Sequence, residues 1–194
     1  MGNYRNEEHT VPIKMSFVDL THTGVSVSKN TFPYGPAMVA AYAKKQLEEE
    51  IDLEIFRFPE EFSGYLEKNI PKFACFSVFI WNQVLSHEYA KHIKMSSPET
   101  IIVFGGVNFP ENVSNYRNEY FDCFPAIDFF IEGEGELAFV ELFNVLKTVD
   151  FNVERFKKSR MVTSNLNYTV DGELVIGKLQ PTLKDLTILP SPYL

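Results

Sequence analysis

The sequence predicts an α/β fold, in which a doubly wound, five-stranded parallel sheet carries helices on both faces. Short apolar runs alternate with longer amphipathic stretches from residue 13 to about residue 150. The run Phe73–Ile80 is almost continuously apolar, as expected for a strand that is covered on both faces. Because strands that alternate with helices need right-handed crossovers, the sheet should be parallel.

Five short apolar runs are the predicted strands. In chain order they cover Ile13–Leu20, Asp52–Phe58, Phe73–Ile80, Thr100–Phe104 and Asp128–Ile131. The short third and fourth strands are expected at the centre of the sheet. The resulting strand order is 2-1-3-4-5, as in flavodoxin-like variants of the Rossmann-like fold.

The stretches between the strands have the composition of helices. They are predicted over Ala37–Glu50, Glu60–Lys68, Asn82–Met95, part of Glu111–Phe121, and Glu136–Val149. Pro36 sits where a helix can begin, and Asn82 is a suitable N-cap residue. Residues 1–150 are therefore expected to form one domain.

The pattern changes in residues 151–194. Asn167–Val170 and Glu173–Ile176 flank Asp171-Gly172, which is a two-residue hairpin signal. The last residues, Leu189–Leu194, contain two prolines that stiffen an extended segment. We therefore expect a β-hairpin followed by an extended tail, which would be a linker toward a further domain.

Composition excludes several classes of protein. The net charge of -8 disfavours binding to a polyphosphate, so no nucleic-acid partner is expected. No apolar run approaches the roughly 20 residues of a membrane span, and the polar N-terminus lacks the apolar core of a signal peptide. Cys75 and Cys123 are expected to be reduced, buried thiols. These observations predict a cytoplasmic protein without a membrane partner.

In an open parallel sheet, ligands bind at the carboxyl ends of the strands, near the point where the strand order reverses. This rule selects four segments, which are Thr21–Pro36, Trp81-Asn82, Gly105–Asn108 and Gly133–Glu136. The first of them is long for a strand-to-helix loop. Long loops in compact domains are commonly functional, although a mobile surface loop is the alternative.

Each of the other three segments also has a purely structural interpretation. Gly105-Gly106 can let the backbone approach a ligand closely or can simply make a tight turn. Gly133–Glu136 can present amides and carboxylates to a ligand, or Glu136 can serve only the start of the next helix. Trp81 can form the wall of a site for a flat ligand or belong to the core.

Catalytic and metal-binding patterns are scarce. His87 and His92 are five residues apart on a predicted helix, so they do not share a face, and both are expected to be solvated. The sequence contains no His-Glu-x-x-His motif, no Cys-x-x-Cys pair and no Gly-x-Ser-x-Gly elbow. No catalytic residue and no metal ligand are therefore predicted for this chain alone.

Four motifs in this order and spacing resemble the cobalamin (B12)-binding domain of B12-dependent radical SAM enzymes. They are Pro33-Tyr34-Gly35-Pro36, Phe76-Ser77-Val78-Phe79-Ile80-Trp81-Asn82, Val103-Phe104-Gly105-Gly106 and Glu132-Gly133-Glu134-Gly135-Glu136. The tail is similar to the linker that joins this domain to a radical SAM barrel, so the resemblance covers residues 13–194.

The resemblance implies that the chain is a cobalamin-binding module, whose full-length protein performs methyl transfer or related radical chemistry. The implied partner is a radical SAM barrel in cis or in trans, which would hold the [4Fe-4S] cluster and S-adenosylmethionine. The implied cobalamin contacts are Thr21, His22, Thr23, Gly24, Tyr34, Gly35, Ser77, Phe79, Trp81, Asn82, Gly105, Gly106, Val107, Asn108, Gly133, Glu134, Gly135 and Glu136.

The chain departs from the family pattern in two ways. Many cobalamin proteins ligate cobalt with the His of Asp-x-His-x-x-Gly, but here Asp19, His22 and Gly24 have a different spacing. We therefore favour capping of the strand end for His22 over cobalt ligation. The cluster motif Cys-x-x-x-Cys-x-x-Cys is also missing, because the chain has only two cysteines.

Two other functions remain open at this point. The chain can be a non-catalytic interaction domain on the same fold that has lost its cofactor site. It can also bind a flavin or a nucleotide, although no hydroxyl-rich phosphate loop directly opens a helix. Uptake of a red chromophore would indicate cobalamin binding, uptake of a yellow one would indicate flavin binding, and capture of a protein partner would indicate an interaction domain.

Overall fold

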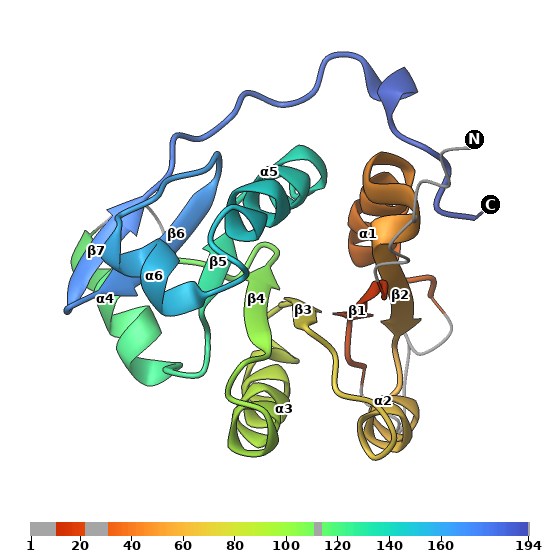
Figure 1. The fold of residues 1–194 in the computed structure, drawn as a ribbon, viewed down its shortest axis with the longest axis horizontal. Coiled ribbons are helices and arrows are strands. Elements are labelled where there is room, and N and C mark those ends of the chain that lie inside the picture. Colours follow the sequence, from red (N-terminus) through yellow and green to blue (C-terminus); the bar gives the residue numbers. More distant parts are fainter. Residues whose placement is uncertain (1–10, 22–30, 111–113, 194) are drawn as a thin grey trace, which may run out of the picture.

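The protein forms one sheet between two layers of helices (Figure 1). The computed structural model describes residues 11–21, 31–110 and 114–193. Within them the sheet has seven strands in the order β2-β1-β3-β4-β5-β6-β7. Their bounds are β1 Ile13–Val18, β2 Ile51–Phe56, β3 Phe73–Ser77, β4 Ile101–Gly105, β5 Phe129–Ile131, β6 Leu166–Val170 and β7 Glu173–Ile176.

The pairing of the first five strands is parallel, which confirms the predicted order 2-1-3-4-5. The C-terminal hairpin predicted around Asp171-Gly172 is also present as β6 and β7. Rather than standing apart, it extends the sheet, because β6 pairs antiparallel with β5 through Phe130 and Asn167. The sheet is therefore mixed, with a parallel part that ends at β5.

The helices divide between the two faces of the sheet (Figure 1). Their bounds are α1 Tyr34–Leu47, α2 Pro59–Leu66, α3 Gln83–Ser96, α4 Ser114–Cys123, α5 Glu136–Lys147 and α6 Val153–Lys158, with 3₁₀ turns η1 at Glu48–Glu50 and η2 at Leu186–Ile188. Helices α1, α5 and α6 cover one face, and α2, α3 and α4 cover the other. This is the doubly wound arrangement that the alternating sequence pattern predicts.

Alternating side chains of the strands fill two separate cores. On the α1/α5 face, Phe17 and Phe73 lie against Phe139, with ring centroids 5.2 and 5.9 Å apart. On the opposite face, Phe76 packs against Phe62 of α2 at 5.9 Å. A single strand thus stabilises both layers, which explains why β3 is apolar at nearly every position.

Several element ends differ from the predicted ones. Strand β3 ends at Ser77, and Ile80 has left the sheet with 81% of its surface exposed. Helix α1 starts at Tyr34, because Pro36 is tolerated in the first turn, where backbone N–H groups have no helical acceptor. The predicted end of α1 is a 3₁₀ turn, and the six residues of α6 were missed because so short a helix shows no period.

Two expectations about solvent exposure were wrong. His87 is buried, with 6% of its surface exposed, whereas His92 is exposed as predicted. The His87 ring packs against Phe124 at 5.0 Å, and its Nε2 accepts a hydrogen bond of 3.4 Å from the Ala126 backbone. Cys123 is exposed rather than buried, while Cys75 is buried, and both are free thiols.

Burial lowers the pKa of His87 below its ordinary value of 6.5. Since the unfolded chain then binds the proton more tightly, the free energy of unfolding should fall as the pH drops through 6.5 toward the folded-state pKa. His87→Gln should remove this part of the pH dependence, and His92→Gln should leave it unchanged. Urea unfolding at pH 5.5, 6.5 and 7.5 (about one unit either side of the histidine pKa) measures it. Identical pH profiles for wild type and His87→Gln would contradict the prediction.

Candidate functional site

A slot opens on the α1/α5 face at the carboxyl ends of β3, β4 and β5. Its volume is about 290 Å³. Helices α1 and α5 form its sides, through Val39 and Phe139, and the sheet forms its floor. It therefore lies where a parallel sheet of this strand order binds ligands.

The floor of the slot is apolar. Phe17, Cys75, Val103 and Ile131 come from four neighbouring strands and project from the same face, because side chains alternate along each strand. Burial raises the pKa of the Cys75 thiol, so this group stays protonated and acts as an apolar surface. The sequence analysis missed these four residues, although the period-2 pattern of the strands identifies their common face.

Two glycine-bearing turns, Gly105-Gly106 and Gly133–Glu136, form the rim of the slot. Gly106 has a φ of +121°, and a Cβ there would lie 2.6 Å from the Val78 carbonyl oxygen. The backbone conformation and the close approach of Val78 therefore require a glycine at position 106. Gly105 is different, because a Cβ on it would meet only the Ile131 carbonyl oxygen, at an ordinary 3.5 Å.

Eight of the predicted contact residues come together on this slot, and all of them except Ser77 belong to three of the four selected segments. They are Gly35, Ser77, Gly105, Gly106, Gly133, Glu134, Gly135 and Glu136. These residues are up to about a hundred positions apart in the chain, and the crossovers of the fold bring them to one edge.

Five other predicted residues lie near this edge but outside the lining of the slot. Phe79 and Trp81 stack on each other with centroids 4.6 Å apart and planes 4° apart. Trp81 is 58% exposed and Val107 is 79% exposed, so Trp81 is not the core aromatic of the alternative interpretation. Asn108 is hydrogen-bonded to Gln83, and Tyr34 is 55% exposed beside the C-terminal tail.

Asn82 and Thr21 are buried, and Asn82 connects the strand ends. Its side chain accepts from the Phe79 N–H at 2.8 Å and donates to the carbonyl oxygens of Leu20 and Ser77, each at 3.1 Å. The predicted N-cap position of Asn82 is confirmed, but the capping bond expected of its side chain is not formed. The residue directly precedes α3, but its side-chain amide is used between β1 and β3.

Asp19 is already engaged at the end of β1. Its carboxylate pairs with Arg57 at 2.6 Å and accepts from Asn82 at 3.4 Å. Burial raises the pKa of Asp19, and the Arg57 guanidinium opposes that rise. His22, Thr23 and Gly24 lie outside the described residues. Among the residues that the structure describes, no three His, Cys, Asp or Glu side chains converge on a metal position.

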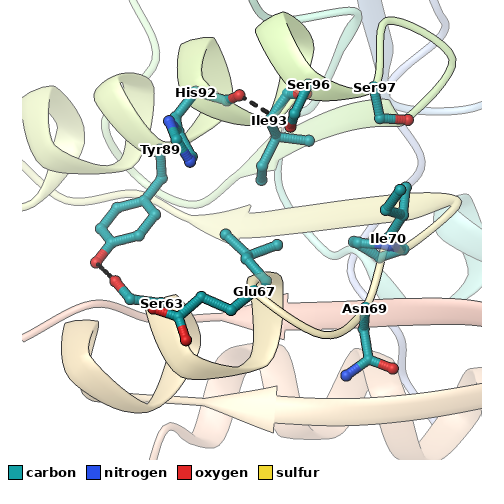
Figure 2. A pocket seen from close by; sticks show the side chains of 11 residues that line it. Ser63, Glu67, Asn69, Ile70, Tyr89, His92, Ile93, Ser96 and Ser97 are labelled. Carbon is teal, nitrogen blue, oxygen red and sulfur yellow. Dashed lines mark hydrogen bonds between the residues drawn. The ribbon is translucent and has the colours of Figure 1, made fainter.

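Figure 2 shows a second cavity of about 230 Å³ between α2 and α3. It includes Ile70 and Pro71, which precede β3, and Ser97, which precedes β4. It therefore opens at the amino ends of the strands, away from the slot. Two of its lining side chains, those of Ser63 and Tyr89, are hydrogen-bonded to each other at 2.7 Å. Ligand binding in this fold favours the carboxyl edge, so the slot is the candidate site.

Comparison with known proteins decides the family. The family model of the B12 binding domain matches residues 21–143, which include the rim of the slot and all of its lining residues except Phe17. The chain belongs to the B12-binding domain family. This match confirms the resemblance to a cobalamin-binding domain that the four sequence motifs indicate.

Two proteins that are similar to this chain are much larger than it is. The cobalamin-dependent radical SAM methyltransferase TokK of Streptomyces tokunonensis is 29% identical over 133 residues, which are 68% of this chain and 17% of TokK. The cobalamin-dependent S-adenosylmethionine radical enzyme OxsB, with aqua-cobalamin and S-adenosylmethionine bound, superposes with a TM-score of 0.62 at 17% identity. That match covers 93% of this chain and 24% of OxsB. A second OxsB structure, with aqua-cobalamin alone, gives a TM-score of 0.59 at 18% identity.

The similarity to OxsB shows the fold, and it extends over most of the chain. Both relatives are much longer than this chain. Among the described residues, none of the helices has the length and apolar character needed to span a bilayer.

Proposed function

We propose that this chain is the cobalamin-binding module of a B12-dependent radical SAM protein, and that the slot between α1 and α5 holds the nucleotide arm of cobalamin. The observation that carries the proposal is the slot itself. Three of the four segments selected from the sequence converge on it, and all of its lining residues except Phe17 lie in the region that matches the B12 binding domain.

The slot is large enough for one arm of cobalamin but not for the whole cofactor. Sites for drug-sized ligands measure about 300–1,000 Å³, and cobalamin is larger than such ligands. At about 290 Å³ the slot suits a flat aromatic group such as the dimethylbenzimidazole base at the end of the nucleotide arm. The corrin ring would remain outside the slot.

The residues present fit such an arm chemically. Phe17, Val39 and Phe139 offer apolar contacts to a base. The Ser77 hydroxyl and the Glu136 carboxylate, both at the slot, can accept hydrogen bonds from ribose or amide groups. The glycine turns form the rim of the slot, and their backbone groups can contact the rest of the arm there.

When bound, cobalamin supplies a cobalt centre that can carry a methyl group. The chain's own residues bind and orient the cofactor and exclude water from one end of it. Radical chemistry further needs a cluster held by three thiolates, and this chain has two cysteines. We therefore propose a radical SAM barrel, in cis or in trans, as the partner. The free thiols of Cys75 and Cys123 fit a reducing compartment such as the cytoplasm.

Titration of the full chain with hydroxocobalamin tests the proposal. A saturable change in the cobalamin absorbance spectrum, with a Kd of about ten micromolar or tighter, is expected, and the coloured cofactor should co-elute with the protein in gel filtration. No spectral change and no co-elution at about a hundred micromolar would contradict it. That result would favour the interaction-domain function on the same fold.

The lower ligand of cobalt gives a separate prediction. Since His22 does not have the spacing of the cobalt-ligating histidine, His22→Ala should leave both the Kd and the spectrum of bound hydroxocobalamin unchanged. Absorbance and electron paramagnetic resonance of the cobalt(II) form measure this. Loss of a nitrogen hyperfine pattern in the variant would show that His22 is a cobalt ligand after all.

A further inference from the structure

The C-terminal segment, residues 180–193, runs back across the α1/α5 side of the molecule (Figure 1). It is held at its far end beside α1. The Lys45 ammonium donates to the Ile188 carbonyl oxygen at 2.9 Å, and the rings of Phe32 and Tyr193 lie 4.5 Å apart. The segment therefore docks on the same helix that forms one side of the slot.

One buried side chain ties the near end of this segment to the rim of the slot. Asn165 is 2% exposed and has a φ of +60°, a conformation that asparagine tolerates better than most residues. Its Nδ2 donates to the Glu134 carbonyl oxygen at 2.9 Å, and its Oδ1 accepts from the Gln180 N–H at 2.7 Å. The rim loop and the segment thus share one amide.

Glu134 makes a second connection. Its carboxylate accepts a hydrogen bond of 2.9 Å from the Leu183 backbone N–H. Glu134 and Glu136 line the slot and also line a neighbouring cavity of about 510 Å³, whose other wall is the segment itself, from Leu183 to Tyr193. The same two residues therefore face the slot on one side and the segment on the other.

We propose that Glu134 is a positioning residue that couples docking of the C-terminal segment to cobalamin binding in the slot. The docked segment holds the Gly133–Glu136 loop in the conformation that forms the rim. Since a ligand that needs the ordered rim must favour the docked segment, the coupling is reciprocal. This inference rests on the proposed function for its ligand, whereas docking of the segment does not depend on that function.

Four variants of the full chain test the hydrogen bond between the Leu183 backbone N–H and the Glu134 carboxylate. Leu183→Pro deletes the donor N–H, and Glu134→Ala deletes the acceptor. Leu183→Ala keeps the N–H and Glu134→Gln keeps an acceptor oxygen, so they are the matched controls. Circular dichroism establishes that each variant keeps the fold.

Two readouts are expected to move together. Without cobalamin, hydrogen exchange at the Gln180 amide, and at Leu183 where the amide exists, should be about tenfold faster in the two deleting variants than in the controls. The Kd for hydroxocobalamin should rise about tenfold in the deleting variants relative to the controls, the size expected from the loss of one hydrogen bond. Saturating hydroxocobalamin should in turn slow exchange at both amides in the wild type.

A double-mutant cycle separates coupling from direct contact with the ligand. If Glu134 acts through the segment, Glu134→Ala combined with Leu183→Pro should weaken binding no more than either alone. Additive losses would overturn the proposal, because Glu134 would then contact cobalamin independently. Binding by the wild type with unchanged exchange at Gln180 would also overturn it. Absence of cobalamin binding in every variant, with exchange altered as expected, would refute the proposed function and leave only a docked segment.

Discussion

Gly105→Leu is expected to raise the Kd for hydroxocobalamin about thirtyfold, which corresponds to about 2 kcal/mol of overpacking. Gly105 ends β4 and lines the slot on the same face as Val103. A leucine there would fill the space proposed for the base. The backbone should tolerate it, since a Cβ meets only the Ile131 carbonyl oxygen, at 3.5 Å. Isothermal titration or absorbance titration measures the effect.

Two substitutions serve as controls for this effect. Gly105→Ala adds one methyl group and should change the Kd by less than about threefold. Gly64→Leu, on α2 where the structure shows open space around the glycine, should leave the Kd unchanged. Equal affinity of wild type and Gly105→Leu would mean that cobalamin does not use the slot.

The largest expected effect on stability is that of Arg117→Met. Arg117 is 1% exposed, and its guanidinium pairs with Glu132 at 2.7 Å and donates to Asn167 at 3.0 Å. It also lies 4.8 Å from the centre of the Phe109 ring. The side chain thus ties α4 to the loop after β5 and to β6. Its loss leaves the Glu132 carboxylate unpaired and should lower the free energy of unfolding by about 3 kcal/mol.

Urea denaturation measures this change, with two further variants for comparison. Lys158→Met removes an exposed ion pair with Glu154 and should have little effect. Glu132→Gln added to Arg117→Met removes the unpaired charge and should restore part of the lost stability. An unchanged denaturation midpoint for Arg117→Met would show that the buried guanidinium contributes nothing to the fold.

Most of the fold was predictable because its signals are local. The run Phe73–Ile80, which contains β3, is almost continuously apolar, and Asp171-Gly172 marks the C-terminal hairpin without any tertiary information. Pairing of β6 with β5 was not predictable, since it depends on which sheet edge is left open. The burial of His87 was missed for a similar reason, because Phe124 and the Ala126 N–H come from another part of the chain.

The candidate site was predictable at the level of segments more than of side chains. Glycine turns after β4 and β5 are visible in the sequence and lie on the slot. The function of Asn82 was not visible, because its amide bonds to carbonyl groups of two strands that only the fold brings together. Trp81 was selected as the only tryptophan, yet it stacks on Phe79 outside the slot. Asn165 carried no signal at all, since its position depends on the loop and segment that it joins.

Comparison of hydroxocobalamin with its cobinamide analogue, which lacks the nucleotide arm, tests the central claim most directly. If the slot between α1 and α5 holds that arm, the wild type should bind cobalamin at least about tenfold more tightly than cobinamide, and Gly105→Leu should reduce this difference to less than about twofold. Equal affinities of the wild-type chain for both corrinoids would contradict the claim.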